Sequence, residues 1–215
     1  MRRTLKIITV LVFIFLYLPM IVLMVGSFSS TKDLATFGSF TFSNYSELMR
    51  DGTLLRLLLN SLIVAVLSAG ISTVLGTAAA IGIHAMSRRM KSVVMGVTNI
   101  PLTNPEIVTG VSLALLFAFV GQLLKLNNVL GFTTLIIAHI TFNLPYIILS
   151  VMPKLRQMDP NLGEAAMDLG CTPWQAFYKV QLRELLPGII SGAMMAFTMS
   201  LDDFVISYCV YGPEF

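Results

Sequence analysis

The stretch FTMSLDDFVISYCV, residues 197–210, places two adjacent aspartates, Asp202 and Asp203, in an otherwise apolar run. Charged residues make up 12% of the 215-residue chain and hydrophobic residues 56%, whereas a soluble domain carries about a quarter charged residues. We therefore expect lipid to surround much of this chain. A carboxylate inside lipid is costly and usually faces a bundle interior or a water-filled path. The apolar run thus predicts a membrane span, and the aspartate pair predicts a functional position within it.

Five stretches are apolar enough to cross a bilayer, which takes about 20 residues. They cover residues 7–28, 57–83, 92–124, 126–153 and 185–210. Together with the loop 154–184 they predict one transmembrane domain over residues 1–215, in an all-α membrane protein built as a polytopic helical bundle. The first run is longer than the apolar core of a signal peptide, so we interpret it as an uncleaved anchor.

The basic residues predict the orientation of the spans, because lysine and arginine favour the cytoplasmic side. With the N-terminus in the cytoplasm, ten basic residues lie inside and four outside. The inside residues are Arg2, Arg3, Lys6, Arg88, Arg89, Lys91, Lys154, Arg156, Lys179 and Arg183, and the outside residues are Lys32, Arg50, Arg56 and Lys125. Five crossings then place the C-terminus outside.

Three of the eleven acids fall inside predicted spans: Glu106, Asp202 and Asp203. Adjacent residues on a helix point about 100° apart, so the two aspartates cannot face one narrow path equally. We expect one to face the path and the other to accept hydrogen bonds from a neighbouring helix or subunit. All three are candidate substrate-path residues.

The third span contains NIPLTNPEIVTG, residues 99–110, in which Pro101 and Pro105 remove backbone donors. Proline also disfavours helix at the preceding Asn104. This pattern predicts a broken helix, which is tolerated at membrane depth where it lines a cavity. Glu106 then stands near the start of the second half-helix, where an acid alternatively serves only as a helix-start charge.

The inside loop 154–184 predicts two short helices joined by a glycine elbow. Asp159–Pro160 marks a helix start and Gly170 a helix stop. Thr172-Pro173-Trp174-Gln175 reads as a capping box. A DNA-binding helix-turn-helix has a similar turn, but four basic residues against four acids, in a loop tethered to membrane spans at both ends, argue against nucleic acid. An amphipathic pair resting on lipid headgroups stays open.

The same loop carries a resemblance. Glu164-Ala165-Ala166, then Gly170 after three residues, then Val180-Gln181-Leu182 after nine resemble the EAA loop of bacterial ABC-importer permeases. The family has proline after that leucine, where this chain has Arg183. The segments HITFNLPYIILSV, EAAMDLG, SLDDFVIS and YGPEF are similar to the PotC-like permease subunits of spermidine/putrescine importers, over nearly the whole chain from the first span onward.

The resemblance implies a type I ABC-importer permease fold and a set of partners. Glu164, Ala165, Ala166 and Gly170 would dock on the ATPase. The implied partners are a PotB-like second permease, a PotA-like ATP-binding subunit dimer, an extracytoplasmic PotD-like polyamine-binding protein and membrane lipid. The location implied is the bacterial inner membrane. Permeases of this family have six spans, so five of six are expected here, with the last outer loop and sixth span absent. This chain alone is then not expected to transport.

The sequence offers no phosphate-binding loop, no nucleophile–base set and no metal-ligand spacing, and Cys171 and Cys209 match no ligand pattern. We therefore expect no cofactor and no enzyme activity in this chain, with ATP used by a partner. Acids without lysine or arginine in the predicted spans favour a cationic substrate. The charge argument does not distinguish one cation from another, and the resemblance to spermidine/putrescine permeases implies that the function is polyamine import. Alternatives are an importer permease for another cationic solute, a secondary transporter that uses the intramembrane carboxylates, and, least favoured, a membrane scaffold.

Overall fold

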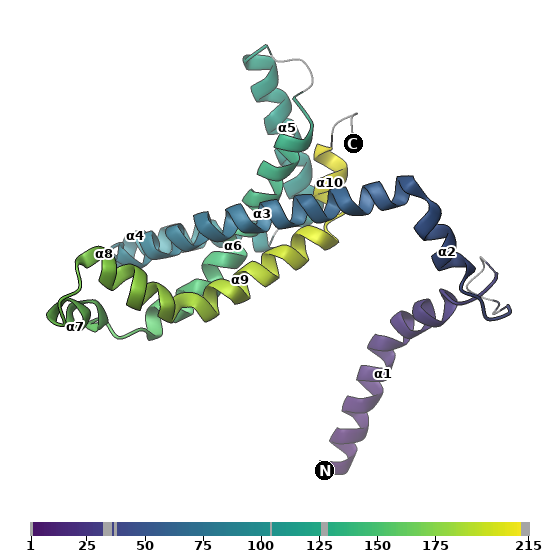
Figure 1. The fold of residues 1–215 in the computed structure, drawn as a ribbon, viewed down its shortest axis with the longest axis horizontal. Helices are drawn as coiled ribbons and strands as arrows, with labels where there is room; N and C mark the ends of the chain where they lie inside the picture. The colour runs from purple at the N-terminus through teal and green to yellow at the C-terminus, as the bar shows by residue number, and fades with distance from the viewer. Residues whose placement is uncertain (1, 32–35, 37, 104, 126–128, 212–215) are drawn as a thin grey trace. The chain divides into compact units, whose positions relative to one another are not determined.

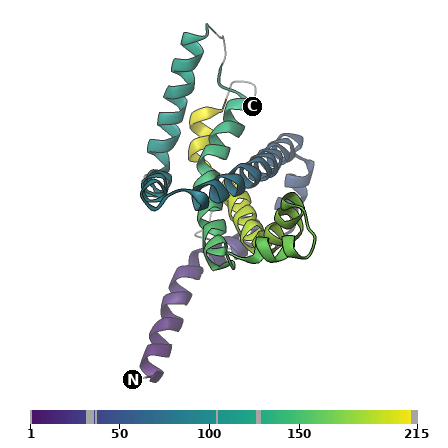
Figure 2. The same ribbon diagram turned by 90° about the vertical axis from the view of Figure 1, so that its left-hand side faces the viewer.

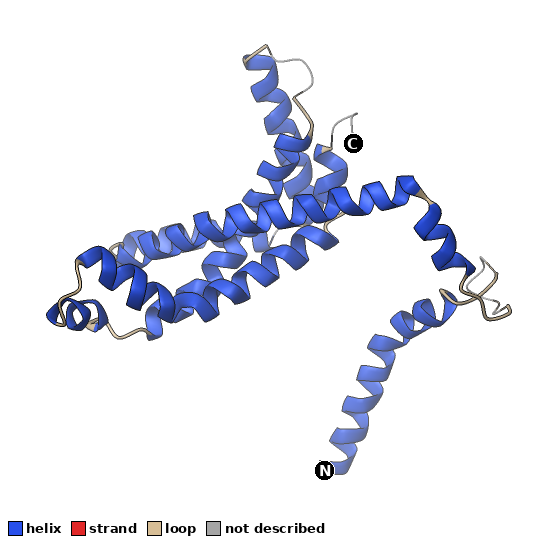
Figure 3. Ribbon diagram, viewed as in Figure 1, coloured by secondary structure: helices blue, strands red, loops and turns tan. Residues whose placement is uncertain are grey.

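Helices form nearly all of the described chain in the computed structural model, which describes residues 2–31, 36, 38–103, 105–125 and 129–211. Figure 3 shows these helices joined by short loops, and within these ranges the extended pairing is one isolated bridge, between Ser29 and Phe40. The helices are α1 (Arg2–Gly26), α2 (Ser43–Arg50), α3 (Gly52–Ala85), α4 (Arg88–Thr103), α5 (Glu106–Leu123), α6 (Phe132–Gln157), α7 (Leu162–Asp168), α8 (Pro173–Ala176), the π-helical turn η1 (Phe177–Gln181), α9 (Leu182–Asp202) and α10 (Val205–Val210).

Five helical segments in the described ranges are long and apolar enough to cross a membrane. They are Leu5–Gly26, Gly52–Ala85, Glu106–Leu123, Phe132–Gln157 and Pro173–Asp202. This confirms the predicted fold class, an all-α polytopic membrane protein. Several helices extend beyond the uncharged stretches, because a helix satisfies its own backbone hydrogen bonds in lipid and in water alike.

Two predicted spans are interrupted helices. The break predicted in the third span is confirmed, because α4 ends at Thr103, α5 begins at Glu106, and Pro105 between them is extended. The stretch 185–210, expected as one span, also divides, because α9 ends at Asp202 and α10 begins at Val205. Asn104, the beginning of the fourth predicted span at 126–128, and the GPEF end of the YGPEF motif at 212–215 lie outside the described residues.

The chain forms two compact units, Met1–Leu59 and Asn60–Phe215. In the first, every side chain from Leu5 to Val25 of α1 is exposed, as expected of a helix that is apolar all round and surrounded by lipid. After α1, the rings of Phe28, Phe40, Phe42 and Tyr45 pack together in stacked, tilted and edge-to-face pairs with centroids 5.2–5.6 Å apart, and they connect the bridge with α2.

The second unit is organised around α6, which packs along α9 (Figure 1). Small residues permit the close approach: a Cβ added at Gly188 would lie 3.0 Å from the Ser150 carbonyl oxygen, and one at Gly192 would lie 3.2 Å from the Ser150 Cβ. Membrane helices associate through such small residues, because lipid supplies no hydrophobic drive between them. One core cluster lies here and includes Ile147, Val151 and Leu185.

A second core cluster joins α5, α6 and α10 and contains Ala138, Phe142, Ile206 and Val210. The turned view in Figure 2 shows α5 rising away from the helices that surround α6. The two clusters meet α6 at different levels, so α6 links the packing of α9 with that of α10. The assignment of residues 1–215 to one transmembrane domain remains a prediction.

Candidate functional site

Asp203 caps the helix that follows the break between α9 and α10. Its Oδ1 accepts a hydrogen bond from the Ile206 backbone N–H at 3.2 Å, and its Oδ2 accepts one from the Ser207 N–H at 2.9 Å. An aspartate at this position satisfies backbone donors that a helix start leaves free. The Asp203 side chain is only 2% exposed. The carboxylate therefore holds the start of α10.

His139 of α6 lies beside this cap and is fully buried. Its Nε2 lies 3.1 Å from the Ser207 Oγ and 3.8 Å from the Asp203 Oδ2, and its Nδ1 lies 2.9 Å from the Ser200 Oγ. The Ser200 Oγ in turn lies 2.8 Å from the Ser68 Oγ of α3. We call these five side chains (Ser68, His139, Ser200, Asp203 and Ser207) the histidine network. It joins α3, α6, α9 and α10.

Asp202 differs from its neighbour. Its side chain is exposed, and it makes no hydrogen bond or ion pair with the part of the chain that the structure describes. The two aspartates thus point into different surroundings, as expected, but the cause is the break after Asp202, where Asp203 leaves the helix with ψ 114°. Asp202 presents a free carboxylate at the break, whereas the Asp203 carboxylate is held.

Glu106 begins α5, directly after the extended Pro105, and is exposed. One turn later, a Cβ added at Gly110 would lie 3.4 Å from the Ile206 Cα and 3.4 Å from the Cys209 Sγ. Because α5 packs against α10 in this way and both helices run in the same direction (Figure 1), the acid at the start of α5 and the aspartates before α10 lie towards the same end of this helix pair.

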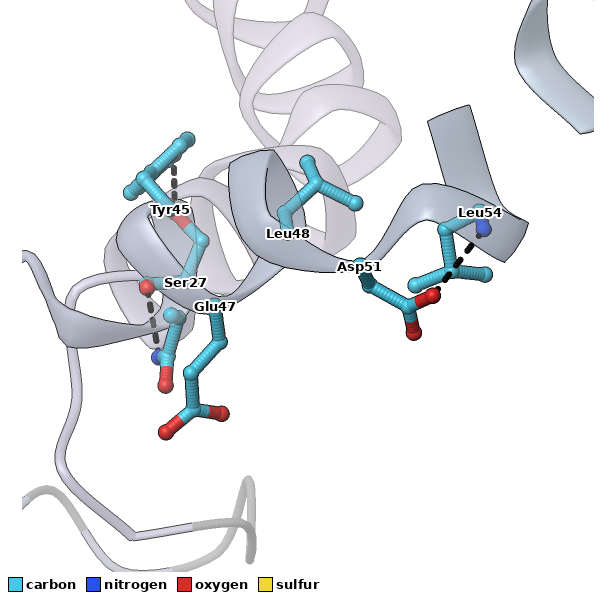
Figure 4. Close-up of a pocket in the computed structure, with 7 residues that line it drawn as sticks. Ser27, Tyr45, Glu47, Leu48, Asp51 and Leu54 are labelled. Atoms are coloured by element: carbon cyan, nitrogen blue, oxygen red, sulfur yellow. Dashed lines mark hydrogen bonds between the residues drawn. The ribbon is translucent and has the colours of Figure 1, made fainter. Parts of the chain in front are cut away.

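A separate pocket of about 420 Å³ lies in the first unit and is lined by Ser27, Asn44, Tyr45, Glu47, Leu48, Asp51 and Leu54. Figure 4 shows the Asp51 carboxylate reaching the backbone of the following helix, where its Oδ1 accepts hydrogen bonds from the Thr53 and Leu54 N–H groups. The Ser27 Oγ and Tyr45 Oη lie 2.8 Å apart. Asp51 therefore caps α3, which leaves Glu47 as the free acid of the pocket.

The elbow after α6 has the predicted stop and cap. Gly170 has φ +87°, its N–H donates to the Met167 oxygen, and the Cys171 N–H donates to the Ala166 oxygen. This pair of bonds is the Schellman ending of a helix, which favours glycine. The capping box is also confirmed, because Thr172 and Gln175 exchange side chain–backbone bonds of 3.2 and 3.3 Å. The helix expected from Asp159–Pro160 begins later, at Leu162, because Asp159 instead accepts a bond from the Asn161 N–H.

The elbow exposes large apolar side chains around that turn. Leu169 is 88% exposed and Trp174 is 74% exposed, and the Trp174 and Phe177 rings lie 5.8 Å apart. Glu164 and Ala165 are exposed, whereas Ala166 is buried. The apolar tip and the Glu164–Ala165 edge form one surface, which we call the elbow surface.

The sequence pointed to the three acids at the helix breaks (Glu106, Asp202 and Asp203) and to the elbow, but His139 was not among the candidate site residues. The structure brings together Asp203 and His139, from segments 64 positions apart. Because a lone histidine in an apolar run has no characteristic spacing, only the fold reveals its partners. The absence of lysine and arginine from the predicted spans likewise gave no sign that a side chain of this chain would lie beside Asp203.

Sequence comparisons show which known proteins this chain resembles. Residues 72–214 match the family described as binding-protein-dependent transport system inner membrane component. The chain is 37% identical to the putrescine transport system permease protein PotI of Escherichia coli K12, over 96% of this chain and 74% of that protein. It is 35% identical to the spermidine/putrescine transport system permease protein PotC of the same organism, over 95% of this chain and 75% of that protein.

Proposed function

Because this chain belongs to the binding-protein-dependent transport system inner membrane component family, we propose that it is the membrane-spanning permease subunit of an ATP-driven importer that brings polyamines into the cytoplasm. The observation that carries the substrate class is its similarity, over nearly its whole length, to permeases for putrescine and for spermidine/putrescine. The chain is thus a membrane transport subunit.

The exposed acids at the two helix breaks suit this substrate class. Putrescine and spermidine carry several ammonium groups at neutral pH, since primary amines of this kind titrate near the lysine value of about 10.4. Neither residues 98–110 nor residues 195–211 contain lysine or arginine. Glu106 and Asp202 are therefore the proposed path carboxylates. Asp203, whose side chain is held by α10, contributes negative charge from behind the path surface.

The remaining parts of the proposal concern partners and orientation. A second permease would complete the path, an exported binding protein would deliver the polyamine, and an ATP-binding subunit pair would supply energy. The N-terminus would lie in the bacterial cytoplasm, as the ten-to-four division of basic residues favours. The elbow, with Glu164, Ala165, Ala166 and Gly170, would then lie on the cytoplasmic side. Its elbow surface would contact the ATP-binding subunit through the exposed Leu169 and Trp174.

The test of the path is uptake of labelled spermidine into liposomes by the complex assembled with its partner subunits. Asp202→Asn and Glu106→Gln are each expected to lower uptake about fivefold while leaving assembly intact, because a carboxylate–ammonium contact in a wet path contributes about 1 kcal/mol. Glu47→Gln removes an exposed acid of the other unit and serves as the control. Normal uptake by both path variants would contradict the path assignment.

The test of the elbow uses the positive φ of Gly170. A valine there is strained, because the left-handed conformation costs an ordinary residue about 1–2 kcal/mol, whereas asparagine tolerates it. Gly170→Val is expected to reduce spermidine-stimulated ATP hydrolysis severalfold, and Gly170→Asn to retain it. Equal ATP hydrolysis in the wild-type and valine complexes would show that the turn does not transmit the signal.

A further inference from the structure

The histidine network binds both sides of the break between α9 and α10. Ser200, which contacts His139 Nδ1, lies two residues before Asp202 on α9, while Ser207, which contacts Nε2, lies on α10. A single imidazole ring of α6 therefore connects the helix before the break with the helix after it. The two breaks are unlike in this respect, because α5 begins without a side-chain cap.

The histidine network is buried, and its members are linked to one another by hydrogen bonds. His139 is fully buried, Ser68 is fully buried and Ser200 is 4% exposed. A buried polar group without a partner costs about 1–3 kcal/mol, so removing one member leaves others unsatisfied. The ring is thus held at both nitrogens, and it fixes the geometry of the chain between Ser200 and Ser207.

The residue whose placement depends on that geometry is Asp202. It lies between the two anchored serines and beside the anchored Asp203, yet its own side chain is exposed and unbound among the described residues. If the break were free to extend as a regular helix, Asp202 and Asp203 would each turn by the ordinary helical step. The anchors prevent this, because Asp203 has an extended backbone with ψ 114° and is held by α10.

We propose that His139 is a positioning residue for substrate passage: it bonds Ser200 on one side of the break and, on the other, Ser207, whose hydroxyl donates to Asp203. In this way it fixes where the Asp202 carboxylate meets a passing polyamine. Ser68 extends the same hold to α3. This inference rests on the proposed function, since it assigns His139 a role through a path carboxylate, and it places the ring itself outside contact with substrate.

The test is a double-mutant cycle in the assembled complex, with the initial rate of labelled spermidine uptake as the readout. The variants are His139→Phe, which keeps an aromatic ring without hydrogen bonds, Asp202→Asn, and both together. His139→Phe is expected to lower uptake up to about fivefold, the effect expected for Asp202→Asn. The double variant should take up spermidine as fast as Asp202→Asn does. Once residue 202 carries no charge, a change in its position no longer alters the attraction for the ammonium groups.

A matched control comes from the same helix. Asn143 lies one turn beyond His139, is fully buried, and neither its Nδ2 nor its Oδ1 has a hydrogen-bond partner among the described residues. Asn143→Leu is expected to leave uptake unchanged, because it changes a buried polar side chain of α6 that makes no hydrogen bond to Ser200, Asp203 or Ser207. A loss of uptake equal to that of His139→Phe would show a general packing effect and overturn the positioning role.

The outcomes separate the two levels of the proposal. If Asp202→Asn slows uptake and the effects of His139→Phe and Asp202→Asn multiply, the positioning inference fails while the path assignment stands. If Asp202→Asn has no effect, the assignment of Asp202 to the path fails and the inference fails with it, whereas Glu106→Gln still tests the other path carboxylate. Should His139→Phe not assemble, Ser200→Ala replaces it in the same cycle. This variant removes the partner of His139 Nδ1 and the bond to Ser68, and it leaves the Ser207 contact of Nε2 in place. A loss of uptake that disappears in the Asp202→Asn background supports the positioning role, and a loss that multiplies with that of Asp202→Asn overturns it.

Discussion

The two helix breaks of this permease place acids at helix starts in opposite ways. At the break before α10, Asp203 accepts two backbone hydrogen bonds and lies beside a buried histidine. At the break before α5, Pro105 interrupts the helix by its own ring, and Glu106 follows it exposed, with no side-chain cap on the helix. Side-chain hydrogen bonds therefore fix the break before α10, whereas the proline backbone fixes the break before α5.

The difference shows that an acid inside a membrane span need not act on the substrate. Asp203 performs structural work that a carboxylate does well, since it satisfies free N–H groups at a helix start. Glu106 is not needed to interrupt the helix, because Pro105 already prevents the helix from continuing. Glu106 and Asp202, whose carboxylates make no hydrogen bond to a described residue, are therefore the acids that we propose for the substrate path.

The largest effect that tests this comparison is expected from Asp203→Ala. The substitution removes the cap of α10 and leaves the backbone N–H groups of Ile206 and Ser207 without their carboxylate acceptor, so it should lower the free energy of unfolding by about 2–4 kcal/mol. Thermal unfolding of the purified complex in detergent, together with its yield, measures this loss. Asp202→Ala is the matched control and should change stability little, and equal losses in the two variants would contradict the division of roles.

The fold class was predictable because lipid imposes strong rules on sequence. Long apolar runs revealed the spans, the Asn104–Pro105 pair revealed the first break, and Gly170 with Thr172-Pro173-Trp174-Gln175 revealed the elbow. These signals are local, since they follow from proline geometry, helix capping and a positive φ. They needed no knowledge of the partners of each helix.

The second break was not predictable in the same way. Residues 197–210 contain no proline or glycine, so nothing local stops the helix at Asp202. What stops it is the Asp203 cap together with its neighbour His139, which comes from a distant part of the chain. The sequence could divide the two aspartates between two surroundings, but it could not say which aspartate was buried.

An intermediate effect is expected from Ser207→Ala. The Ser207 hydroxyl lies 3.1 Å from His139 Nε2 and 3.3 Å from Asp203 Oδ2, while its backbone N–H donates separately to Asp203. Alanine removes the bridge and keeps the cap, so the loss of stability should be about 1 kcal/mol, a typical value for one hydrogen bond. The measurement is the same thermal unfolding. Ser46→Ala, at an exposed serine of α2 whose hydroxyl makes no hydrogen bond to any described residue, is the control. A loss with Ser207→Ala as large as that of Asp203→Ala would mean that the hydroxyl rather than the cap holds α10.

The smallest change in stability is expected from Glu106→Ala, and here the two breaks should differ most clearly. Glu106 is exposed and makes no hydrogen bond to any described residue, so its support of α5 is limited to the interaction of its charge with the helix start, about 0.5 kcal/mol. Thermal unfolding of the complex should therefore hardly change, while spermidine uptake falls. The pairing of normal stability with reduced uptake is the reverse of what a structural acid would give. A clear loss of stability would place Glu106 in the same class as Asp203, and the contrast between the two breaks would then disappear.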